Sequence, residues 1–490
     1  MKIFACLILL LALPVEVHAA AHKTETPVRT NGAPVVRVNA VNQGFDFARP
    51  WAKKNPYSRR GTGAVLSSGK VLVTAELVAD NNLVEVEIPR TGQRIPAQID
   101  ALDYHANLAL LSVEDPAPLR GLGSFALDRG ARVGDRVEIL QVENNGEIAR
   151  TPGTVTTIGV LPYPNETLAA LMFKVSSPLQ SRDSSFVLPA ERNGRLLGLL
   201  MRYDARTQTA DLVPSPVIAR FLDFAKTGGS FPRAGVTFSD LRDPGLRKHL
   251  GVPRDGGVYV TGVLADSPAA KAGLKRGDVI LGIDGHSLDQ DGMYDDPAFG
   301  KILFSHLVAM TAPGESMDLE VWRDGGLLDV TLIPEVADPD EAISPPYLFD
   351  EAPRYIVLGG LIFQELNRGF LRQWGGNWRQ SAPQRLVYLD AFQSELPADR
   401  GKIVFLSGIL PGDETLGYNG LENLVVTKLN NKDIRSLEDL LAAAESPIDG
   451  FHKIEFEEDP GTIYLDAESI KASATQLAED YGIPEMTNLP

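Results

Sequence analysis

The stretch from Ser267 to Leu288, which reads SPAAKAGLKRGDVILGIDGHSL, is the strongest constraint on how this chain folds. Ala272-Gly273-Leu274 breaks a short helix, and Lys275-Arg276-Gly277-Asp278 then makes a tight turn that needs glycine's freedom at positive φ. Val279-Ile280-Leu281 is a short apolar run of the kind that forms a buried strand. Asp284-Gly285 marks the next turn. These features, so close together, predict a small module of mixed α and β structure.

This stretch resembles the core of a PDZ domain, where the phrase A-G-L-x-x-G-D-x-I-x-x-I-(N/D)-G recurs. The resemblance implies a first PDZ domain over residues 232–338, which would bind an extended peptide as an added strand at a sheet edge and capture its C-terminal carboxylate. Ala234, Gly235 and Val236 fit the hydrophobic-Gly-hydrophobic loop that holds this carboxylate, so they are the candidate peptide-binding residues. The apolar run from Ile302 to Met310 predicts the helix that flanks such a groove. Plain core packing also explains this run, and the two interpretations are compatible.

Composition limits the other possibilities. The 490 residues are too many for one core and predict about three domains. A formal net charge of −17 argues against nucleic acid and anionic membrane as partners. The seven histidines are scattered, and neither HExxH spacing nor a Walker or dinucleotide-binding glycine pattern occurs. We therefore expect neither a metal site nor a cofactor.

Residues 1–19 look like a secretory signal peptide. Ile3 to Leu13 is a short apolar run, and Val17-His18-Ala19 offers small residues for a cut after Ala19. The alternative is an uncleaved anchor, for which the run is short. Cys6, the only cysteine, lies inside this segment, so the mature chain is expected to lack disulfides and thiol chemistry. The predicted location is outside the cell membrane, secreted or periplasmic if the source is bacterial.

Residues 20–55 lack periodicity and read as a linker that becomes ordered near Trp51. From residue 56 to residue 228 the chain is a series of short β-segments separated by turn residues, a pattern typical of an antiparallel barrel. A helix over Pro214 to Phe224 is predicted to close the series. The predicted segments include 61–66, 70–74, 83–88, 95–100, 108–113, 133–140, 153–158, 171–175 and 196–201.

The series resembles the trypsin-like domain of the HtrA/Deg serine proteases, where G-(S/T)-G-x-x-(I/V) begins the barrel and GTGAVL stands here from Gly61 to Leu66. Together with the PDZ core, the resemblance covers nearly all of the mature chain. It implies a mainly β fold with α+β modules: a trypsin-like double β-barrel over residues 56–228, followed by two PDZ domains.

The three catalytic motifs of that family can be placed residue by residue. The histidine motif T-N-x-H-V-V falls on TAELV, so Leu77 stands where the general base belongs. The aspartate motif D-x-x-(T/A)-D-L-A-L-L falls on DYHANLALL, so Asn107 replaces the carboxylate. The serine motif G-N-S-G-G-P falls on RDSSFV, which puts Ser184 in the nucleophile's place and Arg182 in that of the oxyanion-loop glycine.

These replacements decide the predicted chemistry. A serine hydroxyl becomes a nucleophile only beside a base, which in turn needs a group to orient it. Leucine accepts no proton, and asparagine in the aspartate's place costs about 10⁴ in rate in a chymotrypsin-type triad. The motifs therefore predict a pseudoprotease. The alternative is an active serine endopeptidase that uses Ser184 with His105 as its base, whereas the plainer interpretation of His105 is a surface histidine in a turn.

Residues 339–490 repeat part of the PDZ pattern after an acidic, Pro-containing linker. The segment from Tyr355 to Phe363 offers a similar glycine-containing start, and the run from Val404 to Leu440 repeats the strand–turn–strand order. A last helix is predicted over Ala467 to Tyr481. This region resembles the atypical second PDZ domain of a plant-type Deg subgroup. The resemblance implies a domain that gates or scaffolds the assembly more than it binds substrate.

Together these features predict a secreted HtrA-like pseudoprotease that binds unfolded polypeptides or protein C-termini in protein quality control. A structural PDZ scaffold without client binding is a further alternative, which a blocked loop at Ala234-Gly235-Val236 would favour. The resemblance also implies a trimer-based homo-oligomer that assembles through aromatic N-terminal residues. Phe45, Phe47 and Trp51 are the candidates for that contact, and core packing explains them equally well.

Overall fold

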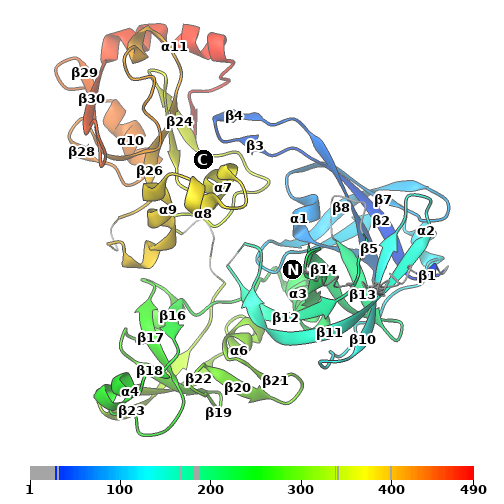
Figure 1. Ribbon diagram of the computed structural model, residues 1–490. Coiled ribbons are helices and arrows are strands. Elements are labelled where there is room, and N and C mark those ends of the chain that lie inside the picture. The colour runs from blue at the N-terminus through cyan, green and yellow to red at the C-terminus, as the bar shows by residue number, and fades with distance from the viewer. Residues whose placement is uncertain are drawn as a thin grey trace, which may run out of the picture.

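The computed structural model describes residues 28–29, 32–165, 167–180, 187–336, 338, 342–397 and 400–489. The predicted signal peptide and Ser184 lie outside the described residues. A body of two barrels is followed by two smaller modules. Figure 1 draws the body in blue to green, the first module in green to yellow and the second module in yellow to red. Within the described ranges, no helix is long and apolar enough to cross a membrane.

The first barrel is a closed sheet in the order β2-β5-β6-β9-β8-β7. Its apolar side chains point inward, and Val36, Val38 and Val73 have no exposed surface. The backbone at Gly63 needs glycine, because a Cβ there would lie 2.4 Å from Cγ1 of Val71. The elements are β2 (Val35–Asn42), β5 (Tyr57–Val65), β6 (Val71–Val73), α1 (Ala75–Val78), β7 (Asn81–Glu87), β8 (Arg94–Asp103) and β9 (Leu108–Val113).

Strand β2 corrects the linker expected over residues 20–55. From Val35 on, this segment is a barrel strand that pairs with β5 on one side and with β7 on the other. Its apolar residues are those of a buried strand, but the surrounding Thr, Pro and Asn residues suggested irregular chain. The barrel body therefore begins before residue 56.

The second barrel belongs to a sheet ordered β1-β11-β10-β13-β14-β15-β12, which an additional pairing of β11 with β12 closes. Helix α3 (Ser215–Thr227) follows it, as predicted for the closing helix. The mainly β double barrel expected from the sequence is thus present. The remaining elements are β1 (Val28–Arg29), α2 (Ala117–Arg120), β10 (Arg136–Val142), β11 (Ile148–Pro162), β12 (Ala169–Ser176), β13 (Leu188–Arg192), β14 (Arg195–Asp204) and β15 (Thr209–Pro214).

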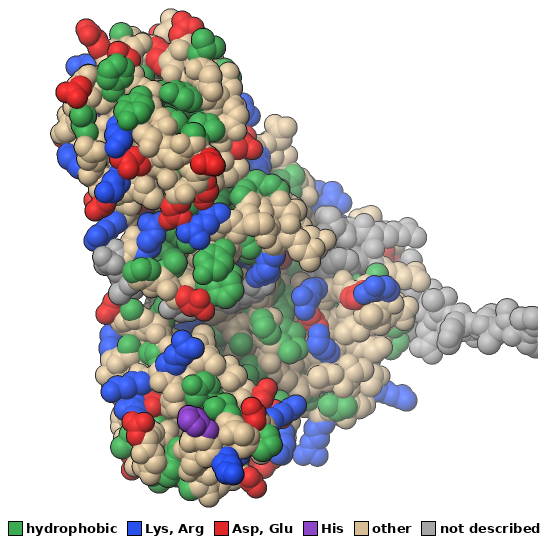
Figure 2. All heavy atoms as spheres, turned by 60° about the vertical axis from the view of Figure 1, so that its left-hand side comes forward, with side chains coloured by type: hydrophobic (Ala, Val, Ile, Leu, Met, Phe, Trp, Pro, Cys, Tyr) green, Lys and Arg blue, Asp and Glu red, His purple; other side chains and the backbone are tan. Residues whose placement is uncertain are grey.

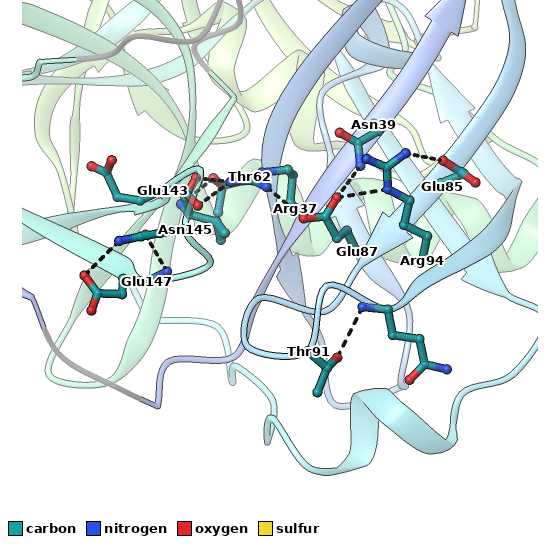
Figure 3. Close-up of polar contacts among 12 residues, drawn as sticks. Arg37, Asn39, Thr62, Glu85, Glu87, Thr91, Arg94, Glu143, Asn145 and Glu147 are labelled. Atoms are coloured by element: carbon teal, nitrogen blue, oxygen red, sulfur yellow. Dashed lines mark hydrogen bonds and ion pairs between the residues drawn. The ribbon is translucent and has the colours of Figure 1, made fainter.

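A polar network joins the two barrels, and Figure 3 shows Arg37 of β2 at its centre. The buried Arg37 guanidinium donates to Glu87 Oε1 at 2.7 Å and to the Val142 carbonyl of the second barrel at 3.3 Å. The Val142 N–H in turn donates to Thr62 Oγ1 at 3.0 Å. Buried charge of this kind is tolerated only when it is paired, so the network fixes how the barrels meet.

The first module has the strand order β16-β17-β18-β22-β23, with β19 paired to β18. The Ser267–Leu288 stretch forms α5, β18 and β19. The hairpin of β20 and β21, which was not predicted from the sequence, packs against the second barrel, where the Phe299 and Phe173 rings lie 6.1 Å apart. The elements are β16 (Val236–Ser239), α4 (Pro244–Leu250), β17 (Val258–Val263), α5 (Pro268–Lys271), β18 (Val279–Ile283), β19 (His286–Ser287), β20 (Met293–Asp296), β21 (Gly300–Leu303), α6 (Ser305–Met310), β22 (Met317–Arg323) and β23 (Gly326–Leu332).

The second module has the order β30-β29-β27-β26-β25-β24-β31, with β28 paired to β27. Helix α11 (Ala467–Tyr481) has the bounds predicted for the last helix. The other elements are β24 (Tyr355–Leu358), β25 (Leu361–Glu365), α7 (Arg368–Leu371), η2 (Arg372–Trp374), α8 (Trp378–Ser381), α9 (Gln384–Ala391), η3 (Gln393–Glu395), β26 (Val404–Ile409), η4 (Asp413–Thr415), β27 (Leu424–Leu429), β28 (Lys432–Asp433), α10 (Leu437–Ala444), β29 (Phe451–Phe456), β30 (Thr462–Asp466) and β31 (Thr487–Asn488).

A hairpin of β3 (Phe45–Asp46) and β4 (Arg49–Lys53) leaves the first barrel and reaches the second module (Figure 1). The buried Phe47 ring meets the Phe370 ring edge-on at 6.1 Å, and the Phe47 carbonyl accepts from Gln364 Nε2 at 2.8 Å. The Trp51 ring lies 5.9 Å from that of Tyr355. Two of the three aromatic residues considered for assembly therefore pack within the chain.

We predict that Phe47→Ala destabilises the protein by on the order of 3 kcal/mol, because it removes a buried ring between the hairpin and the second module. Phe45→Ala, which truncates a half-buried ring on the same hairpin, is the control and is expected to cost much less. Urea unfolding of both variants measures the difference. Equal effects, or a change in subunit number caused by Phe47→Ala alone, would contradict this packing role.

Candidate functional site

Leu77 and Asn107, the residues predicted to stand at degenerate triad positions, lie on segments that a hydrogen bond joins. Leu77, on α1, is 1% exposed. Asn107 stands just before β9 in the left-handed region, with φ of 55°, and its Oδ1 accepts from the Glu76 N–H at 2.9 Å. The side chain at position 107 is thus tied to the backbone next to Leu77. A carboxylate and an imidazole at these two positions would be neighbours.

The chemistry of this pair differs from that of a catalytic pair. Leu77 offers only hydrocarbon, and Asn107 Nδ2 is buried without a hydrogen-bond partner among the described residues. An unpaired buried donor costs roughly 1–3 kcal/mol. The pair keeps a polar group at some cost in stability, yet it contains no group that accepts a proton from a hydroxyl.

His105 is buried, at 6% exposure, so its interpretation as a surface histidine is wrong. Its Nδ1 lies 2.6 Å from Thr167 Oγ1, and its Nε2 lies 3.4 Å from the Tyr347 hydroxyl. Burial lowers the pKa of His105 to about 4; nearby Asp103 opposes this shift, and Arg233 adds to it. The imidazole is therefore neutral at pH 7, and each ring nitrogen has a partner.

The chain between the two modules covers this region. Asp350 and Asp80 bond reciprocally, each backbone N–H donating to the other's carboxylate at 2.7 Å. The Tyr104 hydroxyl donates to Asp350, and the Tyr104 and Phe349 rings lie 4.6 Å apart. Burial raises the pKa of Asp80, although the Asp350 N–H opposes the shift. These contacts join segments some 250 positions apart, and no local sequence pattern signals them.

The backbone of the candidate peptide-binding loop is fixed by contacts with the segment from Leu264 to Ala269. Gly235 has φ of +74°, and a Cβ there would lie 2.2 Å from Cβ of Ser267. Its carbonyl accepts from the Leu264 N–H at 2.9 Å, and the Ala234 carbonyl accepts from the Ala269 N–H at 2.8 Å. The backbone around the loop is thus fixed by glycine-specific packing and by hydrogen bonds.

The strand that follows this loop lies at a sheet edge. Among the described residues, β16 pairs only with β17. The Phe238 ring of β16 lies 4.8 Å from that of Phe304, which caps the N-terminus of α6. A free strand edge beside a helix can accept an extended peptide as a further strand. The structure therefore brings Ala234, Gly235 and Val236 together at such an edge.

Neither a metal site nor a single-sign surface emerges from the part of the chain that the structure describes. No group of three or more His, Cys, Asp or Glu side chains there has the arrangement to hold a metal ion. On the face seen in Figure 2, acidic and basic side chains are interspersed. The formal net charge of −17 is therefore not gathered into one patch on that face.

Comparisons with known proteins agree with this architecture. Residues 344–488 and residues 259–296 each match a family model described as a PDZ domain. Protease Do-like 2, chloroplastic, from Arabidopsis thaliana is 26% identical over 459 residues, which are 92% of this chain and 74% of that protein. A probable periplasmic serine endoprotease DegP-like from Marinomonas sp. (strain MWYL1) is 26% identical over 346 residues, 67% of this chain and 71% of that protein.

Among solved structures, a variant of the HtrA-type protease AlgW with a decapeptide is similar in fold. Its TM-score is 0.50 at 21% identity, and the match covers 62% of this chain and 94% of that chain. At this identity the likeness concerns the fold alone. It agrees with the succession of a double barrel and a sheet module described above.

A double-mutant cycle tests whether positions 77 and 107 are partners. Leu77→His and Asn107→Asp should each destabilise the protein at pH 7, because each buries a polar or charged group without its partner. The double variant should lose roughly 1–3 kcal/mol less unfolding free energy than the two single variants lose together, since the imidazole can then donate to the carboxylate. Urea unfolding measures all four proteins. A control cycle pairs Leu77→His with Asn430→Asp in the second module, and the two effects should be additive there. Additive effects of Leu77→His and Asn107→Asp would contradict the pairing.

The lowered pKa of His105 predicts a pH dependence. Because the folded pKa is about 4 and the unfolded value is about 6.5, the unfolded chain takes up the proton first as the pH falls. Stability from this residue is complete above pH 6.5 and is lost toward pH 4, by roughly 3 kcal/mol at about 1.4 kcal/mol per pKa unit. Between pH 7 and pH 4.5 the free energy of unfolding, measured with urea, should fall less in His105→Gln than in the natural sequence. The pKa values of His306 and His452 are also lowered, but both residues are present in the two proteins and so cancel in the comparison. Equal losses of stability in the two proteins would contradict the assignment of this pH dependence to His105.

Proposed function

The chain is a homologue of the Deg/HtrA proteases that carry PDZ domains, and we propose that it keeps their fold without their hydrolysis. The named relatives are proteases, so the proposal rests on how this chain differs. Leu77 and Asn107 take the positions that the family's motifs give to the base and its orienting carboxylate. Neither accepts the proton of a serine hydroxyl at neutral pH. His105, the other candidate base, has both ring nitrogens engaged.

The function proposed in place of hydrolysis is capture of unfolded polypeptides or protein C-termini, in protein quality control. The observation that carries it is the edge of β16 beside the Gly235 loop, with which no described segment pairs apart from β17. An unpaired edge supports client binding over a scaffold that binds no client. The AlgW variant of similar fold was solved with a decapeptide, which supports a peptide as the ligand. We keep residues 232–338 and 339–490 as the proposed extents of the two PDZ domains.

Export and assembly are further parts of the proposal. Secretion with a cut after Ala19 rests on the apolar run and small residues of positions 1–19. The DegP-like relatives are named periplasmic, whereas Arabidopsis relatives are named chloroplastic or mitochondrial. A trimer-based homo-oligomer is also proposed. Since Phe47 and Trp51 pack on the second module, Phe45 is the aromatic residue of this hairpin proposed for a contact between subunits.

The experiment is cleavage of unfolded casein by Ala20–Pro490 and by its Ser184→Ala variant. We expect neither protein to degrade casein faster than a protease-free blank, because Leu77 and Asn107 hold the positions that the family's motifs give to the base and to its orienting carboxylate. The variant controls for a contaminating protease, whose activity would appear equally in both samples. Cleavage by the natural sequence that the variant loses would contradict the proposal and establish the alternative of an active serine endopeptidase.

A further inference from the structure

The two PDZ modules have the same chain path. In the first the strand order is β16-β17-β18-β22-β23, and in the second β25-β26-β27-β29-β30 follows the same order of pairing. A two-stranded side pairing occurs at the same place in both, β19 on β18 and β28 on β27. The helix before the fourth strand is α6 in one and α10 in the other. The modules can therefore be compared strand by strand.

The comparison holds in detail at the peptide-binding loop. Gly360 precedes β25 as Gly235 precedes β16, and both have positive φ, +89° and +74°. The Gly360 carbonyl accepts from the Leu410 N–H at 2.7 Å, as the Gly235 carbonyl accepts from Leu264 at 2.9 Å. In both modules the register with the next strand then shifts by one residue just before the third residue of the edge strand, Phe363 in β25 and Phe238 in β16. Strand β25 is thus the second module's counterpart of the peptide-binding edge β16.

The edge of β25 is already occupied by β24. β24 pairs antiparallel with β25 over its own whole length, from Tyr355 opposite Gln364 to Leu358 opposite Leu361. β24 also contacts α10, and its Ile356 side chain, 2% exposed, shares a core with Leu437 of that helix. The strand therefore lies between β25 and α10, where a PDZ ligand would add.

The direction of β24 is also that of a PDZ ligand. A ligand lies antiparallel to the edge strand with its C-terminus at the glycine loop. Leu358, the last residue of β24, stands at that end. A free ligand would end in a carboxylate at this point, whereas here Gly359 and Gly360 continue the chain into β25. The loop that would hold a free carboxylate is used as a covalent turn.

Charged and backbone contacts hold β24 in this position. Arg354, just before β24, donates to Glu365 Oε2 of β25 at 2.8 Å and pairs with Glu438 of α10. The other carboxylate oxygen of Glu365 accepts from the Leu437 N–H at 3.1 Å. The far edge of β24 is covered in turn by β31, with Ile356 opposite Thr487.

We infer that β24 is a built-in ligand of the second PDZ module, so that this module takes no free peptide at β25. Capture of extended peptides with a free C-terminus then falls to the first module alone. The inference refines the proposed function and rests on it only for the role of the first module. It also links β24 to the barrel body, because the Trp51 ring of the barrel hairpin packs against Tyr355 of this strand.

Hydrogen exchange of Ala20–Pro490, followed by mass spectrometry, tests the inference. The probe is a decapeptide that ends in the sequence of the built-in ligand, Arg-Tyr-Ile-Val-Leu, with a free carboxylate, and it is compared with the same peptide amidated. We expect the free acid in excess to slow exchange in β16 about tenfold and to leave β24 and β25 unchanged. A change in β24 or β25 on adding the peptide would overturn the inference. No change in either module would remove the proposed role of the first module but support the built-in ligand.

Two matched glycine variants control for the site of binding. Gly235→Ala places a Cβ 2.2 Å from Cβ of Ser267, whereas Gly273→Ala, also at positive φ, meets nothing within 4 Å. Both suffer backbone strain, but only the first deforms the loop. Protection of β16 should disappear in Gly235→Ala and persist in Gly273→Ala. Protection that appears in β25 in either variant would place a peptide in the second module and contradict the inference.

Discussion

The fold is organised by the need to pair the backbone N–H and C=O groups at the edges of its sheets. An unpaired edge is a template for any extended chain, and buried backbone groups are almost always paired. The first barrel closes on itself, and the pairing of β11 with β12 closes the second. In the last module, β24 and β31 cover the edge of β25.

Against this background β16 differs from β25, its counterpart in the second module, in having one side unpaired among the described residues. The same chain path that is capped in the second module is left open in the first, and the difference lies in the segment before the glycine loop. Before Gly360 the chain folds back along β25 as β24. Before Gly235 it turns away, and Arg233 makes an antiparallel bridge with Glu335 instead. Two homologous modules thus differ by the route of a few residues.

The region around Leu77 and Asn107 is likewise closed by contacts within the chain. Leu77 adds a fully buried side chain to the first barrel, which contributes roughly 1.5–3 kcal/mol of stability. Asn107 still makes the hydrogen bond to the Glu76 N–H, so the local backbone keeps its shape without a charge. Next to it, His105 and Asp80 are covered by the chain between the modules. Parts of the chain that lie far apart in the sequence therefore meet in this region.

Sequence reasoning reached the features that depend on local pattern. The glycine-rich turn and buried strand after Ser267, the barrel strands and the bounds of α11 all follow from periodicity and turn chemistry. Placement of Leu77 and Asn107 rested on family motifs, and the structure ties Asn107 to the backbone of Glu76, the residue before Leu77. Whether they occupy the catalytic positions stays a prediction.

What the sequence did not reveal depends on contacts between distant segments. β2 was hidden in a polar stretch and becomes a strand only because β5 and β7 flank it. The burial of His105 depends on Tyr347, 242 positions away. Phe47 was assigned equally to assembly and to core packing, and its contact with Phe370 decides for packing within the chain. In each case the partner lies where no local periodicity points.

The covalent connection of β24 explains why a free peptide would not displace it. A ligand tethered by a short linker has an effective concentration of about millimolar. A free peptide of equal intrinsic affinity at micromolar concentration would then occupy the groove about one time in a thousand. The ion pairs of Arg354 with Glu365 and Glu438 make the tethered strand still harder to replace. An occupied groove in the second module leaves selection of clients to the corresponding edge of the first module, β16, which no tethered strand covers among the described residues.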